Sequence, residues 1–300
     1  MTRFLVTGAS GFIGREVLNV LSRRGIETDA VSRRPPAAEE RPGIAWHRAD
    51  ILQDDLSSLL EARRPTHLLH LAWEATPRVY RDSPANHDWA AASARLAQAF
   101  IKSGGKNFIF AGSCVSYALP AAFCDERETP LADDCAYAVC KAQTERDLAA
   151  LMDAAGGRFA AGRIFYAYGP DEPAGKFIRH VCEGLSSGAP VPLSEGADVL
   201  DYVYKTDVAE AFVALALSAV GGAVNVGSGE AVTVRDIAAR LGEISGRSDL
   251  LAFGKVPANR APVRIVANIG RLTGEVGYRP AVSLDQGLRA CHAFWHDRKP

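Results

Sequence analysis

The stretch FLVTGASGFIGREVLNVL, at residues 4–21, decides the fold. In it a short apolar run, Phe4–Val6, is followed by closely spaced glycines and then by apolar residues at helical intervals. A strand, a tight glycine turn and a helix make a pyrophosphate site, because amides at the helix N-terminus point at the anion and the glycines let it approach. The sequence therefore predicts a dinucleotide site at Gly8, Ser10, Gly11, Phe12, Ile13 and Gly14.

Apolar runs that alternate with amphipathic segments continue this unit through the first half of the chain. The runs expected to be strands are Phe4–Val6, Thr28–Val31, Ile44–Trp46, Leu68–Leu71, Phe108–Ala111 and Phe159–Ile164. The segments expected to be helices are Phe12–Arg24, Leu56–Arg63, Ala85–Ser103 and Tyr137–Ala155. This alternation predicts an α/β fold of the Rossmann type, a doubly wound parallel sheet with helices on both faces.

In the second half of the chain the regular alternation of strands and helices stops. Helices are expected over Gly175–Gly188, over Asp207–Ser218 and after Thr233, whose hydroxyl suits an N-cap. We expect a dinucleotide-binding domain at residues 1–169 and a smaller substrate-binding lobe at 170–300. Because no clean linker separates them, the two are expected to be intertwined, with residues of about 201–230 returning to the first domain.

Composition and charge exclude several classes of function. The 300 residues are 48% hydrophobic and carry a formal net charge of -1, which suits one large α/β unit. Nucleic acid is not an expected partner, because no long basic block is present. No apolar run approaches the roughly 18 residues that a membrane span needs, and the N-terminus leads into a strand without a basic and apolar leader. We therefore expect a cytoplasmic protein that does not bind a membrane.

Cysteine and histidine spacing gives no sign of a metal site. The 6 cysteines include no C-x-x-C pair, and the 7 histidines form no ligand cluster. We expect no metal, and we expect the cysteines to behave as small buried hydrophobes in a reducing compartment.

Tyr137 and Lys141 are the second informative feature. Because they are four residues apart, they share one face of the expected helix. A buried lysine ammonium beside a phenol favours the phenolate, so the pKa of Tyr137 is expected to fall toward the range where it exchanges protons at neutral pH. This spacing occurs by chance in many helices, and it gains meaning here from the glycine turn.

With glycines at intervals of three and the pair Tyr137 and Lys141, the chain resembles the extended branch of the short-chain dehydrogenase/reductases. That branch contains nucleotide-sugar epimerases, dehydratases and ketoreductases, and the resemblance covers nearly the whole chain. It implies a nicotinamide cofactor and a catalytic group of Ser113, Tyr137 and Lys141, with Ser113 four residues before Tyr117. Ser116 is a near competitor, but it stands where the family usually has valine and is interpreted as structural.

The end of the second expected strand bears on which nicotinamide cofactor binds. An acidic residue there binds the ribose hydroxyls of NAD, whereas an arginine accommodates the 2′-phosphate of NADP. Here Ser32 takes the acidic position and Arg33 follows it, so NADP(H) is expected over NAD(H), with a merely solvated Arg33 as the alternative. The resemblance implies further cofactor contacts at Asp50, Ile51, Leu71 and Ala72.

The residues after Ser113 narrow the reaction. The 4,6-dehydratases of the family have Asp-Glu there, whereas this chain has Cys114 and Val115, which cannot act as a carboxylate acid and base. Dehydration is therefore not expected. The substrate-binding residues implied by the resemblance are Trp73, Ser113, Cys114, Tyr166 and Arg264.

Three of these positions can be compared with their counterparts in the family. Trp73 stands where relatives have a small residue, which suggests a reshaped sugar pocket. Tyr166 replaces an asparagine near the substrate phosphates, a variant that resembles some deoxysugar ketoreductases. Arg264 falls where relatives present an arginine to the diphosphate, and an exposed surface arginine is an equal alternative.

These observations predict an NADPH-dependent 4-ketoreductase that acts on a nucleotide-linked 4-keto-6-deoxyhexose. An NAD-dependent nucleotide-sugar 4-epimerase is the alternative within enzymes, because it would use the same catalytic group. A non-catalytic dinucleotide sensor is the alternative from another class. The resemblance also implies a homodimer, built on the helices expected at Ala85–Ser103 and Tyr137–Ala155.

Overall fold

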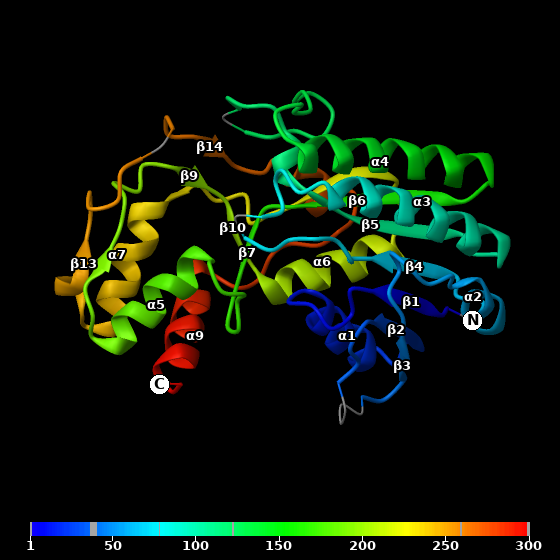
Figure 1. The fold of residues 1–300 in the computed structure, drawn as a ribbon, viewed down its shortest axis with the longest axis horizontal. Coiled ribbons are helices and arrows are strands. Elements are labelled where there is room, and N and C mark those ends of the chain that lie inside the picture. The colour runs from blue at the N-terminus through cyan, green and yellow to red at the C-terminus, as the bar shows by residue number, and fades with distance from the viewer. Residues whose placement is uncertain (1, 37–40, 78, 122, 259, 299–300) are drawn as a thin grey trace.

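The computed structural model describes residues 2–36, 41–77, 79–121, 123–258 and 260–298. A sheet with helices above and below it forms one part of the molecule, and a smaller group of helices and short strands lies beside it (Figure 1). The N-terminus lies in the first part and the C-terminus in the second.

The central sheet has seven strands, and every neighbouring pair in it is parallel. In spatial order they are β11 (Gly222–Val226), β6 (Arg158–Ile164), β5 (Asn107–Ser113), β4 (His67–His70), β1 (Phe4–Thr7), β2 (Thr28–Ser32) and β3 (Ile44–Arg48). The order reverses at β1, as in a doubly wound fold. The α/β prediction is confirmed, and the predicted strands end within two residues of the observed ones.

Helices cover both faces of this sheet (Figure 1). On one face lie α2 (Ser57–Arg63), α3 (Ala85–Lys102) and α4 (Ala136–Ala154), and on the other α1 (Gly14–Arg23) and α6 (Lys205–Leu217). Along β1 the side chains alternate between the two cores: Phe4 and Val6 face α1 and α6, while Leu5 faces α3 and α4. Because both faces are buried, these strands are continuous apolar runs.

The smaller part is built on three helices around a third core. They are α5 (Phe177–Ser187), α7 (Val234–Ser245) and α9 (Leu284–His296). Thr233 caps α7 as predicted, because its side chain accepts a hydrogen bond from the amide of Asp236 at 2.9 Å. The remaining elements are η1 (Cys114–Ser116), β7 (Tyr166–Tyr168), β8 (Val191–Pro192), β9 (Val199–Leu200), β10 (Tyr202–Tyr204), β12 (Val232–Thr233), η2 (Ser248–Leu250), β13 (Leu251–Ala252), β14 (Arg264–Ile265) and α8 (Gly270–Gly274).

Part of the second half of the chain packs into the first. Helix α6 lies against α1, and β11 adds the last strand to the sheet beside β6. The division into domains at residues 169 and 170 stays a prediction.

Across the described ranges, no helix has the length and apolar character needed to cross a membrane. The same residues include no group of three or more potential metal ligands. All six cysteines are free and buried, as expected for small hydrophobes.

Candidate active site

Two glycines of the turn have no room for a side chain. Gly8 has a φ of +66°, and a Cβ built on it would lie 2.7 Å from the amide nitrogen of Ala72. A Cβ on Gly14 would collide with the carbonyl of Gly8. Helix α1 starts there, and no side chain caps its N-terminus. A helix N-terminus without a side-chain cap suits an anion, and the turn fits the pyrophosphate of a dinucleotide.

Next to the turn is a cavity of about 530 Å³. It is lined by Ser10, Ser32, Arg33, Arg34, Arg48, Ala49, Asp50 and Asp54. The Ser10 and Ser32 hydroxyls are 2.7 Å apart, and Ser32 also accepts a hydrogen bond from the amide of Arg34. Ser32 is thus held inside the wall, and three arginines supply positive charge around the opening.

Arg48 is a cavity residue that the sequence analysis did not single out. Strand β3 pairs with β2 so that Arg48 lies beside Ser32. Its position two residues before Asp50, an expected cofactor contact, is the feature of the sequence that could have identified it. The Asp50 carboxylate accepts a hydrogen bond from the amide of Leu52, and Ile51 is buried beside it.

A buried histidine connects the turn to the end of β4. His70 contacts Thr7 through Nδ1 at 2.6 Å and Ser93 through Nε2 at 2.8 Å. Burial, with the nearby charge of Lys141, lowers the pKa of His70 to about 3, so the ring is neutral. The Thr7 hydroxyl also accepts a hydrogen bond from the amide of Ala72, which places Leu71 and Ala72 against the glycine turn.

The structure brings Ser113, Tyr137 and Lys141 together. Ser113 ends β5, and its side chain lies close enough to that of Tyr137, near the start of α4, to lower the pKa of the phenol. Lys141 lies one helical turn further, 2% exposed, and donates a hydrogen bond to the carbonyl of Ala111 at 2.7 Å. Two neighbouring elements, β5 and α4, therefore position all three side chains.

Aromatic rings enclose this group. Lys141 Nζ lies 3.9 Å from the ring centroid of Trp73 and 4.4 Å from that of Phe110. The Trp73 indole donates a hydrogen bond to Asn86, which fixes its orientation. Tyr80 packs edge-on against Tyr137, with ring centroids 4.7 Å apart. Trp73 thus contacts the lysine directly, a relationship that the sequence analysis did not foresee.

The pKa of Tyr137 lies above its ordinary value in this structure, whereas the expected fall, which also counts on the charge of an oxidised nicotinamide, stays a prediction. Burial raises the pKa of Tyr137, and the side chain of Ser113 opposes this only in part. Lys141 Nζ lies 5.7 Å from the centre of the tyrosine ring. Burial also lowers the pKa of Lys141, while the charge of Glu145 raises it. Desolvation of the phenol is therefore the main cause of the raised pKa.

Two of the residues predicted to bind the substrate, Cys114 and Tyr166, are neutral. Cys114 is buried directly after Ser113, and burial raises the pKa of its thiol. The Tyr166 ring lies 5.7 Å from that of Tyr202, and its pKa is raised well above the ordinary value, mainly by burial. Both groups are thus uncharged near neutral pH.

The contact described for Arg264 is with a residue outside this cluster. It is exposed on β14, and its guanidinium lies 5.2 Å from the ring centroid of Phe123. Phosphate binding by Arg264 stays a prediction.

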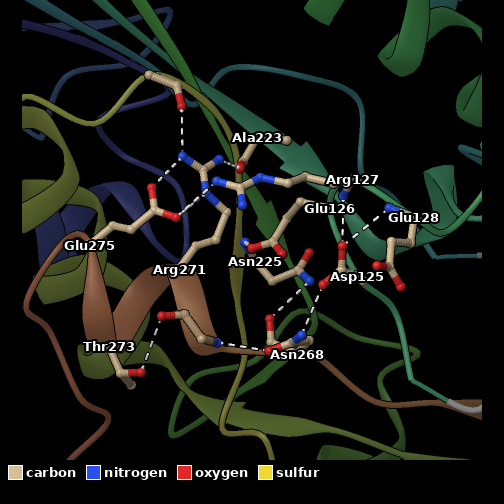
Figure 2. A network of polar contacts seen from close by, with 12 residues as sticks. Asp125, Glu126, Arg127, Glu128, Ala223, Asn225, Asn268, Arg271, Thr273 and Glu275 are labelled. Atoms are coloured by element: carbon tan, nitrogen blue, oxygen red, sulfur yellow. Dashed lines mark hydrogen bonds and ion pairs between the residues drawn. The ribbon is translucent and has the colours of Figure 1, made fainter.

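A polar network joins the loop at Asp125 and Glu126 to Asn225 on β11 and to Asn268 (Figure 2). Asn225 on β11 accepts a hydrogen bond from the Tyr117 hydroxyl at 2.6 Å and donates one to the carbonyl of Cys124 at 2.7 Å. The amide of Asn225 donates to the Glu126 carboxylate at 2.7 Å. The amide of Cys124 in turn donates to the carbonyl of Val266, two residues after Arg264. The network therefore fixes the loop beside the candidate site.

Comparison with known proteins agrees with this geometry. The model of the NAD dependent epimerase/dehydratase family matches residues 4–227. The chain belongs to this family. It is therefore an NAD(P)-dependent enzyme of the oxidoreductase type and a member of the extended short-chain dehydrogenase/reductases, as predicted.

Individual relatives of this family member carry two kinds of activity in their names. It is 28% identical to a UDP-glucose 4-epimerase of Mycolicibacterium smegmatis over 99% of both chains. It is 24% identical to a dTDP-4-dehydro-6-deoxyglucose reductase of Escherichia coli, over 95% of this chain and 94% of that one. The Thermus thermophilus UDP-glucose 4-epimerase, solved in complex with NAD, superposes with a TM-score of 0.86 at 27% identity, over 99% of this chain and 100% of that one.

Proposed function

We propose that the protein is an NADPH-dependent reductase of a nucleotide-linked 4-keto-6-deoxyhexose. The observation that carries the proposal is that the side chains of Ser113 and Tyr137 lie together, with a neutral thiol at Cys114 directly after Ser113. The pair can bind and protonate one carbonyl oxygen. The following thiol cannot serve as the carboxylate that dehydration needs.

The residues of the chain supply binding, orientation and a proton. Ser113 would hold the ketone oxygen, and Tyr137 would donate a proton to that oxygen. The Lys141 ammonium would compensate the phenolate left on Tyr137. When the glycine turn and the cavity beside it hold the dinucleotide, its nicotinamide would supply the hydride.

The cavity beside the glycine turn supports NADP(H) over NAD(H). The position that would hold a carboxylate for the ribose hydroxyls is Ser32, whose hydroxyl already bonds Ser10. Arg33, Arg34 and Arg48 line the same cavity and could pair with a 2′-phosphate. The Thermus thermophilus relative, by contrast, was solved with NAD.

The neutral lining supports a 6-deoxy sugar. Tyr80, Cys114 and Tyr166 are close enough for their charges to influence one another's pKa. Rings and a thiol suit a methyl group better than a charged or hydroxylated carbon. The reductase from Escherichia coli has a 6-deoxy sugar in its name, in line with this choice.

A 4-epimerase is the second candidate, and the named epimerases among the relatives favour it. It would use the same three residues but would recycle its cofactor. A dinucleotide sensor would need none of the three. A homodimer and a cytoplasmic location are further predictions that accompany the proposed reductase.

The deciding experiment is product analysis. With NADPH and a 4-keto-6-deoxy sugar nucleotide, we expect a product heavier by two hydrogens and one NADPH oxidised per product formed. A panel of nucleotides and sugars would identify the substrate. Isomerisation of a nucleotide hexose with no net use of cofactor would establish the epimerase instead.

A further inference from the structure

A buried ion pair lies directly behind the proposed catalytic group. Glu145 follows Lys141 by one turn of α4, and its carboxylate accepts hydrogen bonds from Arg163 on β6 at 2.7 and 3.1 Å. The side chains of Glu145 and Arg163 are 7% and 6% exposed. Both charges are therefore removed from water next to the strand that ends in Ser113.

The backbone of β5 is shaped to admit this pair. Gly112 stands opposite Arg163 in the register of β5 and β6. A Cβ on Gly112 would lie 2.5 Å from Glu145 Oε1 and 3.1 Å from Cγ of Arg163. Any larger residue would push the carboxylate away, and Gly112 is also the neighbour of Ser113. The position of Glu145 is thus coupled to the end of β5.

Few charged or titratable groups face Lys141. On α4 they are Tyr137 and Glu145, and on β4 the neutral His70. The other contacts of its ammonium are the rings of Trp73 and Phe110 and one carbonyl. Burial lowers the pKa of Lys141, and the negative charge of Glu145 raises it. Glu145 is thus the group that offsets the cost of burying the ammonium.

We propose that the Glu145–Arg163 ion pair is a positioning unit whose negative charge keeps the Lys141 ammonium in place for the proposed reduction. Arg163 gives Glu145 an oppositely charged partner inside the protein, so neither of these two charges is buried alone. The charge of Glu145 then offsets the burial of Lys141, one turn away on the same helix. Lys141, in turn, compensates the charge of Tyr137 after proton donation. This step rests on the proposed function, whereas the charge state of Lys141 does not.

The test measures Lys141 directly and needs no substrate. The chain has 7 lysines, so the protein labelled with ¹⁵N-lysine gives a simple NMR spectrum, and Lys141→Met assigns the signal. A variant that carries both Glu145→Leu and Arg163→Met leaves neither Glu145 nor Arg163 buried without its partner. We expect the Lys141 titration midpoint to fall by about one pH unit or more, a tenfold change in proton affinity.

Two further variants separate this effect from general damage. Arg163→Lys keeps both charges and should leave the midpoint near that of the wild type. Asp29→Asn breaks another buried carboxylate pair of the sheet, with Arg63 at 2.7 Å on α2. It should lower the melting temperature without moving the midpoint. An unchanged midpoint in the folded double variant would overturn the proposal.

Activity provides the second readout. If the protein reduces the ketone, kcat should decline at high pH. In the double variant this decline should begin at a lower pH than in the wild type. A shifted midpoint without any reductase activity would support the ion-pair role and reject the proposed reaction. If the double variant does not fold while Arg163→Lys does, the pair serves stability and the proposal is rejected.

Discussion

The Lys141 ammonium lies over the indole ring of Trp73, with Nζ 3.9 Å from the ring centroid. Asn86 holds the indole by a hydrogen bond at 2.8 Å. A tryptophan face attracts a desolvated cation by about 2 kcal/mol. Trp73 therefore acts on the proposed catalytic group as well as on the shape of the pocket.

Replacement of Trp73 should separate these two effects. Trp73→Ala removes the ring from Lys141, and we expect kcat to fall about tenfold, in line with the strength of such contacts. Trp73→Phe keeps a ring face and should stay within about threefold of the wild type. Steady-state kinetics measure both. Trp89→Phe, which changes the ring stacked behind Trp73, is the control and should leave kcat unchanged.

Loss of the Tyr137 hydroxyl should abolish most turnover. Tyr137→Phe removes the proposed proton donor but keeps the packed ring, so we expect kcat to fall by roughly a hundredfold or more. NADPH affinity, followed by fluorescence, and the melting temperature should stay near those of the wild type. Near-normal turnover would mean that the ring serves packing alone.

The arginines of the 530 Å³ cavity should set the cofactor preference. We expect the wild type to bind NADPH more tightly than NADH. Arg33→Ala and Arg48→Ala should each weaken NADPH binding by roughly tenfold or more, as for a lost charged hydrogen bond, with little effect on NADH. Titration of both cofactors measures this. Arg95→Ala, on α3, is the control, and equal affinity of the wild type for both cofactors would refute the prediction.

Glu172 should make stability fall as the pH rises. It is buried, its carboxylate accepts a hydrogen bond from the amide of Arg179, and burial raises its pKa to about 7. The folded state thus holds a proton that the unfolded state releases from about pH 4.5 upward. The stabilisation is complete below that pH and is lost as the pH approaches 7.

Glu172→Gln tests this sign, because the amide stays neutral and can still accept the hydrogen bond. At pH 8 the variant should be more stable than the wild type by about 1–3 kcal/mol, and the gain should vanish near pH 4.5. Thermal melts across this range give the answer. A variant that is less stable at pH 8 would show that the carboxylate charge is favourable there.

Some parts of the site are formed by residues that are close together in the sequence. These parts were predicted from local sequence patterns. The strands are apolar runs because both of their faces are buried, and the glycine turn is one continuous stretch of sequence. Both could therefore be predicted from the sequence. Arg48 was missed because it reaches the cavity through strand register, beside Ser32. The ion pair of Glu145 and Arg163 was missed because its partners come from different elements. The pKa of Tyr137 depends on how deeply the phenol is buried, a property of packing rather than of spacing.

The place of β11 in the sheet has a consequence for anyone who expresses the protein in pieces. A fragment that stops at residue 169 would lack β11 and α6, although it would contain the whole catalytic group. The outer edge of β6 would then be unpaired along its length, and Gly162 would lose the Phe212 ring that packs on it. An open apolar edge recruits other strands. Such a fragment should aggregate. The part of the chain that holds the catalytic group therefore needs β11 and α6, which come later in the sequence, to complete its fold.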